Sequence, residues 1–205
     1  MKRISYMSDH LIDQYRQIHS SRQYGDTSIK NLRYIRPQVA FLAPESIIDF
    51  GCGRSQLVDV IGDACDAKTF RYDPAIPDYA EKPRGGPFDL LINVDVLEHI
   101  PEDELDAIVG EMASLCKNAI IVIDTRPAEA VLPNGENAHC TLKTHERWQN
   151  YLARFFPHVE PIRVARRSRA AFRTWKLDPT EEKRLQRSIM REKLTYGLRR
   201  LAGKR

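Results

Sequence analysis

The chain has 205 residues, of which 42% are hydrophobic and 29% charged, a composition typical of one globular domain with a full core. No apolar run of about 18 residues occurs, which excludes a membrane-spanning helix, and the N-terminal residues lack the apolar core of a secretory signal. The four cysteines, at positions 52, 65, 116 and 140, form no CxxC pair, which argues against a disulfide or zinc framework. We therefore expect a cytoplasmic protein, with peripheral attachment to a membrane as an alternative.

The net charge of +4 is unevenly distributed. Residues 160–205 hold 15 Lys and Arg against 5 Asp and Glu, whereas the rest of the chain holds 17 against 23. The basic C-terminal region is therefore a candidate surface for a polyanion, either nucleic acid, an anionic membrane surface or a phosphorylated glycan. The alternative is a solvated helix whose charges serve solubility alone.

Hydrophobic periodicity predicts an alternation of helices and strands. The expected elements, in chain order, are a helix over 28–42 capped by Ser28 and kinked at Pro37, a strand over 46–50, a helix over 56–65, strands over 69–72 and 88–94, a helix from 101, a strand over 119–123, a helix capped by Thr144, strands over 158–166 and 170–177, and a helix from 180.

This order predicts an α/β fold, a Rossmann-like doubly wound and mostly parallel sheet that ends in an antiparallel hairpin and is followed by a basic C-terminal helix. Three regions are expected along the chain. They are an N-terminal helical or lid segment over 1–27, in which Tyr24 and Gly25 fold over a cofactor, a main domain over 28–177, and a basic helical tail over 178–205.

A glycine turn joins the first expected strand to the helix after it. In Asp49-Phe-Gly-Cys-Gly, Gly51 and Gly53 allow a tight turn and a close approach of the backbone to a ligand. Asp73 follows Gly53 by 20 residues, at the tip of the next strand, where a carboxylate accepts hydrogen bonds from ribose hydroxyls in nucleotide-binding sheets. Because no phosphate-binding GK[ST] loop is present, the turn favours a nucleoside ligand without phosphates.

The motifs Ile-Ile-Asp-Phe-Gly-Cys-Gly, Asp73 and Phe88-Asp-Leu-Leu…Asp-Val-Leu-Glu-His resemble those of class I S-adenosylmethionine-dependent methyltransferases, over roughly residues 28–177. The chain departs from the family pattern in Ser55, where a third glycine is common, and in the 14 residues between Asp73 and Phe88, which imply a short or missing third strand. The resemblance implies that residues of the glycine turn line the methionine and ribose part of the cofactor, that an acid holds the ribose and that the next strand ends beside the transferring methyl; the residues concerned are Asp49, Gly51, Cys52, Gly53, Asp73, Asn93 and Asp95.

A second cluster lies in Asp95-Val-Leu-Glu-His99. In helical geometry Asp95 faces both Glu98 and His99, and His139 in the long polar loop after the next strand is the best candidate for a fourth group. Two carboxylates and two imidazoles suit Mn, Fe, Co or Zn better than Mg, and such a metal lowers the pKa of a hydroxyl acceptor. We expect Arg126 and Asn137 to contact the substrate.

The DxxEH pattern with a distant histidine resembles ubiquinone-pathway O-methyltransferases and enzymes that methylate the terminal 2′-hydroxyl of small RNAs. That resemblance implies Asp95, Glu98, His99 and His139 as metal ligands, although Asp95 replaces the usual glutamate. Two alternatives stay open. In one, His139 is a metal-free general base, with His99 and Asp95 in catalytic support. In the other, Glu98 and His99 only cap the helix and shape the substrate cavity.

The leading functional hypothesis is an O-methyltransferase, metal-assisted in one version, that acts on a sugar hydroxyl of a surface glycan of the lipopolysaccharide type or its precursor. An RNA ribose 2′-O-methyltransferase that holds RNA through the basic tail is the first rival. A small-molecule methyltransferase and a non-catalytic binding subunit are the others. The intact glycine turn and acidic cluster argue against the last.

Overall fold

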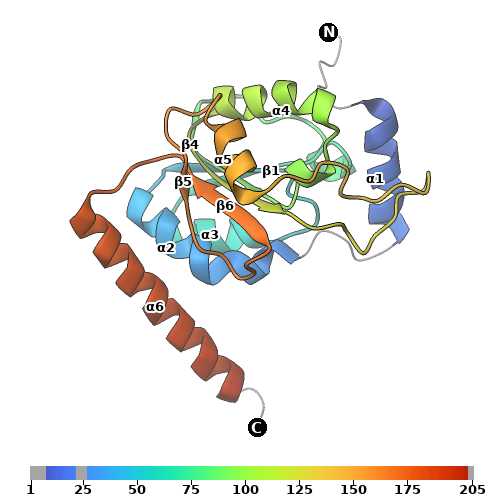
Figure 1. Cartoon of the computed structure of the whole chain (residues 1–205). Coiled ribbons are helices and arrows are strands. Elements are labelled where there is room, and N and C mark those ends of the chain that lie inside the picture. Colours follow the sequence, from blue (N-terminus) through green and yellow to red (C-terminus); the bar gives the residue numbers. More distant parts are fainter. Residues whose placement is uncertain (1–7, 22–26, 203–205) are drawn as a thin grey trace.

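Six strands form one sheet in the order β2-β1-β3-β4-β6-β5 in this computed structural model, which describes residues 8–21 and 27–202 (Figure 1). The first four strands are parallel, β6 is antiparallel to β4, and β5 is antiparallel to β6. This arrangement confirms the predicted mostly parallel sheet with a C-terminal antiparallel pair. The strands are β1 Ser46–Phe50, β2 Lys68–Tyr72, β3 Phe88–Val94, β4 Cys116–Asp124, β5 Glu160–Pro161 and β6 Arg169–Arg173.

Helices cover both faces of the sheet, with α4 and α5 on one side and α2 and α3 on the other (Figure 1). Three short 3₁₀ turns interrupt the connections. The α-helices are α1 Asp9–Ser21, α2 Leu32–Leu42, α3 Leu57–Cys65, α4 Glu102–Leu115, α5 His145–Leu152 and α6 Pro179–Ala202, and the 3₁₀ turns are η1 Thr27–Asn31, η2 Pro77–Tyr79 and η3 Leu97–His99.

The alternation of side chains along the strands builds the two cores. In β3, Leu90 and Ile92 pack against α2 and α3, whereas Leu91 packs on the opposite face with α4 and α5. All three side chains are fully buried, as expected of a central parallel strand covered on both faces. Because the strands are packed on both faces, their carboxyl ends lie in fixed positions along one edge of the sheet.

The first helix after the N-terminal region differs from the prediction. It begins at Leu32, because residues 27–31 form a 3₁₀ turn, and Pro37 lies inside a helix that it does not divide. Ser28 is not the N-cap. Its hydroxyl instead donates to Ser55 Oγ at 2.5 Å and so joins the 3₁₀ turn to the glycine turn.

The edges of the sheet carry the other differences. Between Asp73 and Phe88 the described chain contains only the turn η2, so the expected short or missing third strand is confirmed and β2 lies at one edge. At the other edge, β5 and β6 are shorter than the predicted strands over 158–166 and 170–177. Pro161 has no N–H to donate, which limits β5 to an edge position.

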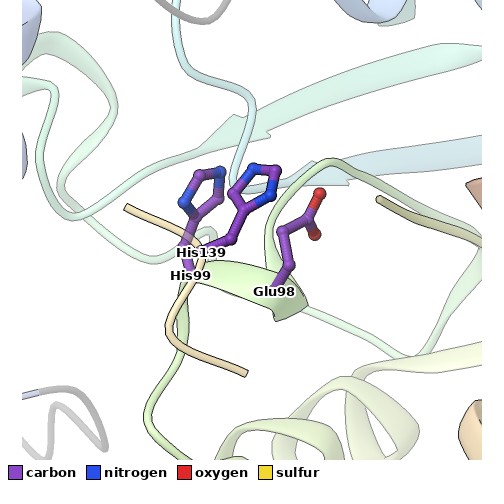
Figure 2. A group of neighbouring side chains, drawn as sticks. All are labelled: Glu98, His99 and His139. Atoms are coloured by element: carbon purple, nitrogen blue, oxygen red, sulfur yellow. The ribbon is translucent and has the colours of Figure 1, made fainter. Parts of the chain in front are cut away.

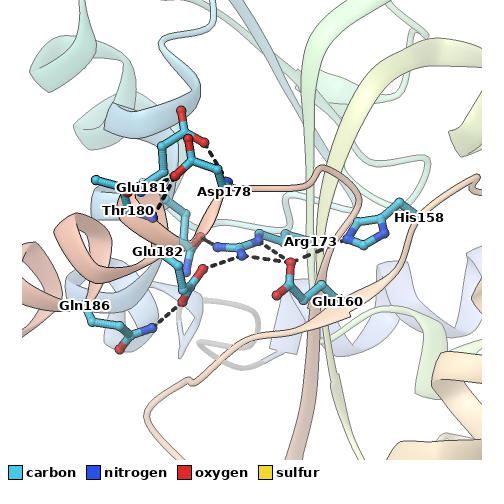
Figure 3. Close-up of polar contacts among 9 residues, drawn as sticks. His158, Glu160, Arg173, Asp178, Thr180, Glu181, Glu182 and Gln186 are labelled. Carbon is cyan, nitrogen blue, oxygen red and sulfur yellow. Dashed lines mark hydrogen bonds and ion pairs between the residues drawn. The ribbon is translucent and has the colours of Figure 1, made fainter.

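Helix α6 is fixed to the body at its N-terminal half (Figure 3). Arg173 of β6, only 2% exposed, donates to Glu160 at 2.8 Å, to Glu182 at 2.5 Å and to Gln38 at 3.1 Å. Leu185 and Ile189 of α6 are buried against α2. Among the described residues, no helix is long and apolar enough to cross a membrane. The division of the chain into three regions, with boundaries after residues 27 and 177, stays a prediction.

Candidate active site

The four parallel strands end at one edge of the sheet, where ligands bind in open α/β sheets. The glycine turn after β1 is bonded to the end of β2. Gly51 N donates to Tyr72 O at 2.7 Å, and Gly53 N donates to Asp73 Oδ2 at 2.8 Å. The two motifs that lie 20 residues apart in the sequence therefore meet directly.

Gly51 also touches the end of β3. Its φ of +79° is left-handed, and a Cβ at this position would lie 2.5 Å from Val96 Cγ2. Val96 lies two residues after the last residue of β3. The segments that follow β1, β2 and β3 are therefore neighbours at this edge of the sheet. Gly53 and Asp73 are in direct contact, and the proximity of Asp95 to both stays a prediction.

The Asp73 carboxylate, buried in the structure, receives two backbone hydrogen bonds. Gly53 N donates to one oxygen and Ala75 N to the other at 2.9 Å. Burial raises the pKa of Asp73, while these two hydrogen bonds act against the shift. The carboxylate thus shapes the turn, and its remaining lone pairs are available to ribose hydroxyls.

Two buried oxygens beside the glycine turn accept no hydrogen bond from any described residue. They are Asp49 Oδ2 in β1 and Asn93 Oδ1 in β3, whose Nδ2 donates to Phe50 O at 2.8 Å. Burial raises the pKa of Asp49 to about 7, against the lowering effect of Arg71. Because orphaned buried acceptors are costly, these atoms fit a ligand that donates hydrogen bonds or carries positive charge, such as the amino end of S-adenosylmethionine.

Cys52 lies between the two glycines and is buried. Its thiol contacts Gly53 O at 3.5 Å, and burial raises its pKa, so it stays protonated. All four cysteines are free, as expected of reduced thiols. Cys52 therefore contributes to the site through its backbone and its volume rather than as a nucleophile.

A cavity of about 620 Å³ opens between α1 and the segment that follows β2. This volume lies in the range of small-molecule and cofactor sites. Three arginines contribute to its walls. The lining residues are Arg16, Gln17, His19, Ser20, Arg54, Arg71, Ala75, Ile76, Pro77, Asp78 and Tyr79.

Glu98 and His99 of η3, which follows β3, lie close to His139 of the loop after β4 (Figure 2). One potential ligand atom of each lies within 4.8 Å of those of the other two. Glu98 is fully buried; its Oε1 accepts from Asp124 N at 2.8 Å, while its Oε2 accepts no hydrogen bond from a described residue. Burial, with the nearby Asp95 charge, raises the pKa of Glu98 well above its usual value.

Backbone carbonyls fix the tautomers of both histidines. His99 Nδ1 lies 2.8 Å from Ala138 O, and His139 Nδ1 lies 2.5 Å from Arg126 O. Because a carbonyl only accepts, each Nδ1 is the donor and each neutral ring carries its lone pair on Nε2. Burial and the neighbouring His139 lower the pKa of His99 to about 3, so this ring is neutral at physiological pH.

Asp95 lies outside the cluster of Glu98, His99 and His139 among the described residues, and its assignment as a metal ligand stays a prediction. Its φ of +59° places it in a left-handed conformation before the short turn η3, so the helical spacing that would have aligned it with Glu98 does not apply. Its Oδ2 instead accepts from Arg169 Nη2 at 2.7 Å. A catalytic or cofactor-binding role for Asp95 stays a prediction.

Arg169 is a site residue that was not predicted from the sequence. This residue begins β6 and pairs with Asp124 at the end of β4, so an antiparallel strand delivers it to the same edge as the ends of the parallel strands. Its side chain is 8% exposed and holds the Asp95 carboxylate. The available signal was an arginine at the start of the second hairpin strand, directly after a turn.

The loop over residues 126–143 covers the cluster. The side-chain amide of Asn137 is used within this loop: its Oδ1 accepts from Ala128 N and His139 N, and its Nδ2 donates to Ala128 O. These hydrogen bonds shape the loop, and a contact of the exposed Asn137 with substrate stays a prediction. Arg126 is exposed and lies 3.4 Å from Asp124, where its guanidinium remains accessible to substrate.

Helix α1 packs on this loop and reaches the cluster. From the sequence, residues 1–27 were predicted only as a helical or lid segment, without a contact to the cluster. Tyr15 OH donates to Ala138 O at 3.0 Å and lies 2.9 Å from His99 Nδ1. Leu11 and Tyr15 pack with Leu132 and Ala138 of the loop. The predicted lid residues 24 and 25 lie outside the described residues.

Comparisons with known proteins agree with this geometry. The family model described as a methyltransferase domain matches residues 22–183. No curated protein matches the chain. A solved Burkholderia thailandensis 1,6-didemethyltoxoflavin-N1-methyltransferase, with bound 1,6-didemethyltoxoflavin and S-adenosylhomocysteine, is similar at a TM-score of 0.59 and 12% identity, over 82% of this chain and 89% of that one.

Two further solved structures are similar in fold. Human N-acetylserotonin methyltransferase in complex with S-adenosylmethionine has a TM-score of 0.54 and 12% identity, over 80% of this chain and 56% of that chain. The methyltransferase domain of bacterial CtHen1-CN has a TM-score of 0.51 and 13% identity, over 68% of this chain and 94% of that one. The glycine turn, the sheet order and the family match together establish that the chain belongs to the methyltransferase domain family and is a class I S-adenosylmethionine-dependent methyltransferase.

Proposed function

We propose that the acceptor is a hydroxyl group, and that Glu98, His99 and His139 bind a divalent metal ion that activates it. The observation that carries the proposal is the donor set of the cluster. Both histidines have Nδ1 bonded to a backbone carbonyl, and a buried side-chain oxygen of Glu98 accepts no hydrogen bond from the described residues. Metal-bound histidines show this same pattern, with the second ring nitrogen donating to a backbone carbonyl or carboxylate.

The chemistry of the acceptor explains the need for such a cluster. S-adenosylmethionine supplies an electrophilic methyl group on a sulfonium, and the protein must hold the acceptor in line with it. An amine needs only to be deprotonated, but an unactivated alcohol requires a general base or a metal ion that lowers its pKa. The close grouping of Glu98, His99 and His139, with Asp95 nearby, supports that role.

The donor types support a particular group of ions. Two nitrogens and one carboxylate oxygen suit Zn, Mn, Fe or Co better than Mg, which prefers oxygen ligands. Ligands of one such ion lie about 2.1 Å from it and so at most about 4.2 Å apart. The spacing of up to 4.8 Å in the cluster requires the side chains to draw together slightly.

A metal-free version uses the same residues. His139 accepts the acceptor proton on Nε2 as general base, and Tyr15 and Ala138 hold the neighbouring His99 in position. Burial lowers the pKa of His99 to about 3, which makes it a weak base, so His139 is the better candidate for this role.

For the cofactor, we propose that the adenosine end enters the cavity beside α1, with Asp73 on the ribose. Ile76 and Tyr79 provide apolar and aromatic surface there, and Arg54 borders the glycine turn. The orphaned Asp49 oxygen would receive the amino group of the methionine end. The cavity volume of about 620 Å³ supports this assignment.

For the acceptor molecule, we propose a polyhydroxylated substrate, a sugar of a surface glycan or its precursor. The support is the exposed polar loop over 126–143, in which Arg126 borders the cluster and a pair of adjacent hydroxyls would suit a metal site. RNA ribose and small-molecule acceptors are the alternatives. A screen that follows transfer of a labelled methyl group to glycans, RNA and small-molecule extracts separates them.

The test of the cluster compares His99→Ala, His139→Ala and Glu98→Gln with His145→Ala, a control at an exposed histidine on α5. We expect each cluster variant to lose methyl transfer by about 10²- to 10⁴-fold while keeping affinity for S-adenosylmethionine. Metal analysis of the purified protein should find one divalent ion per chain that the His139→Ala variant lacks.

Two results would change the proposal. Full activity of all three cluster variants would remove both versions of it. Full activity of the wild type in excess chelator, combined with inactive cluster variants, would remove the metal and leave the general base.

A further inference from the structure

The outward face of α6 combines cations with apolar side chains. Lys183, Arg187 and Arg191 follow each other at helical spacing of four and are exposed. Met190 and Leu194 lie beside them at the same spacing, with 57% and 63% of their surface exposed. We call these five residues the α6 outer face.

The acidic residues of α6 lie elsewhere on the helix and are engaged. Glu182 pairs with Arg173, Glu192 pairs with Arg36 of α2, and Glu181 accepts from Asp178 N. The described part of the helix therefore turns its negative charges toward the body or its own N-terminus. The α6 outer face keeps only positive and apolar groups.

The helix is held firmly where it meets the body. Arg173 ties its first turns to β5, β6 and α2 (Figure 3), and Leu185 and Ile189 are buried. Lys193 lies over the Tyr34 ring of α2 at 4.9 Å. Figure 1 shows α6 as an outer layer on the side of the molecule away from α1. The α6 outer face is thus a preformed surface that no described residue covers from outside.

We propose that the α6 outer face docks the enzyme on an anionic phospholipid surface. Cations next to exposed apolar side chains on a helix are the composition of helices that lie in the membrane interface, where lysine and arginine meet phosphates and apolar groups enter the acyl boundary. This docking goes beyond the methyl-transfer reaction and holds whichever acceptor the enzyme uses.

Two other occupants fit less well. A second copy of the same face would bring Arg187 and Arg191 against like charges in an isologous contact. Single-stranded nucleic acid is bound by cations together with exposed aromatic rings on which bases stack. The one aromatic side chain exposed in the described part of α6, Tyr196, already lies under Arg33, 4.6 Å from its ring centroid.

The test is co-sedimentation of the full chain with vesicles of phosphatidylcholine alone or mixed with phosphatidylglycerol. The wild type should bind only the mixed vesicles, and less at high salt. Arg187→Gln with Arg191→Gln should lower the partition coefficient by roughly tenfold or more, since each cation near an anionic surface contributes about a fivefold factor. Met190→Ser with Leu194→Ser should weaken binding further.

The matched control is Arg163→Gln with Arg167→Gln, which removes the same charge from exposed positions between β5 and β6. It should bind the mixed vesicles almost as the wild type does. All variants should keep the wild-type far-ultraviolet circular dichroism and rate of methyl transfer to a small acceptor.

Any of four results overturns the proposal. The wild type stays unbound with mixed vesicles, or the control pair loses as much binding as the α6 pair, or the chain forms a dimer that the α6 variants dissolve. Binding of a short RNA at protein concentrations at which the mixed vesicles are not bound also overturns it. That result would assign the α6 outer face to nucleic acid instead.

Discussion

At the scale of single residues, Gly51 gives the sharpest test of the glycine turn. Gly51→Ala adds a Cβ that would lie 2.5 Å from Val96 in a left-handed backbone. We expect a loss of about 2 to 4 kcal/mol in the free energy of unfolding, together with a loss of affinity for S-adenosylmethionine. Urea denaturation and calorimetric titration measure the two effects.

Gly135→Ala is the matched control for this substitution. Gly135 has a φ of +89° but no atom within 4 Å of an added Cβ. It should lose only about 1 kcal/mol, from backbone strain alone, and keep the cofactor affinity. Equal effects of the two substitutions would contradict the close contact between β1 and β3.

His99 makes a second prediction at this scale, in the pH dependence of stability. Its pKa is about 3 in the folded protein and 6.5 in its ordinary state, so the unfolded chain binds more protons between these values. Stability from this residue is therefore complete above pH 6.5 and is lost as pH falls toward 3. Between pH 7 and pH 5 the wild type should lose about 2 kcal/mol relative to His99→Gln.

Urea denaturation at the two pH values measures this difference, with His145→Gln as an exposed control. Asp49 and Glu98 have raised pKa values and act in the opposite direction, but they are common to all three proteins. A wild type and a His99→Gln variant that respond equally to pH would contradict a neutral, buried His99.

The site residues were predictable where the chemistry depends on strand ends. Gly51, Gly53 and Asp73 meet as expected because parallel strands bring their carboxyl ends to one edge. The geometry of Asp95 was not predictable, since a helical relation to Glu98 was assumed where the backbone is left-handed. Arg169 was missed because only the antiparallel pairing with β4 brings it there.

At the scale of elements, the attachment of α6 depends on Arg173. Glu160→Gln with Glu182→Gln leaves this buried cation without a carboxylate partner. We expect a loss of about 2 kcal/mol in the free energy of unfolding, less than for a fully buried pair because both glutamates are more than a third exposed. Urea denaturation measures it.

Glu181→Gln is the control for that pair, on the same turn of α6. Its side chain accepts from Asp178 N, which glutamine can also do, so its effect should stay within about 0.5 kcal/mol. A double variant as stable as this control would show that Arg173 is held by packing alone.

Helix α1 and the loop over 126–143 form a second unit at this scale. Tyr15→Phe removes the hydroxyl that contacts Ala138 O and His99 but keeps the ring in its apolar contacts. Because the hydroxyl orients His99, we expect methyl transfer to fall by about tenfold, with unchanged affinity for S-adenosylmethionine. Single-turnover kinetics measure the rate, and Tyr196→Phe on α6 is the control.

The elements differ in how well the sequence predicted them. β3 and β4 were predicted well because uninterrupted apolar runs are typical of strands covered on both faces. Ser28 was wrongly taken as a helix cap, since its partner Ser55 is distant in sequence. The hairpin strands were predicted too long, because β5 contains Pro161 and lies at an edge where pairing is limited.

At the scale of the whole molecule, the fold agrees with the family match. The sheet has the order β2-β1-β3-β4-β6-β5, and the chain matches a methyltransferase domain. The charge asymmetry along the sequence becomes spatial in the fold, with Asp49, Asp73 and Asp124 at the strand ends and the cationic α6 outer face on the outermost helix. The sequence predicted this asymmetry but not its geometry, because the positions of Arg173 and Glu182 that fix α6 depend on tertiary contacts.

The central claim is that the ends of β1, β2 and β3 hold the cofactor with its sulfur facing Glu98, His99 and His139. A crystal structure of the protein with S-adenosylhomocysteine tests it most directly. The account predicts the ribose at Asp73, the amino acid end near Asp49, and the sulfur on the side of the cluster. A ligand bound elsewhere, or a sulfur directed away from His99 and His139, would contradict it.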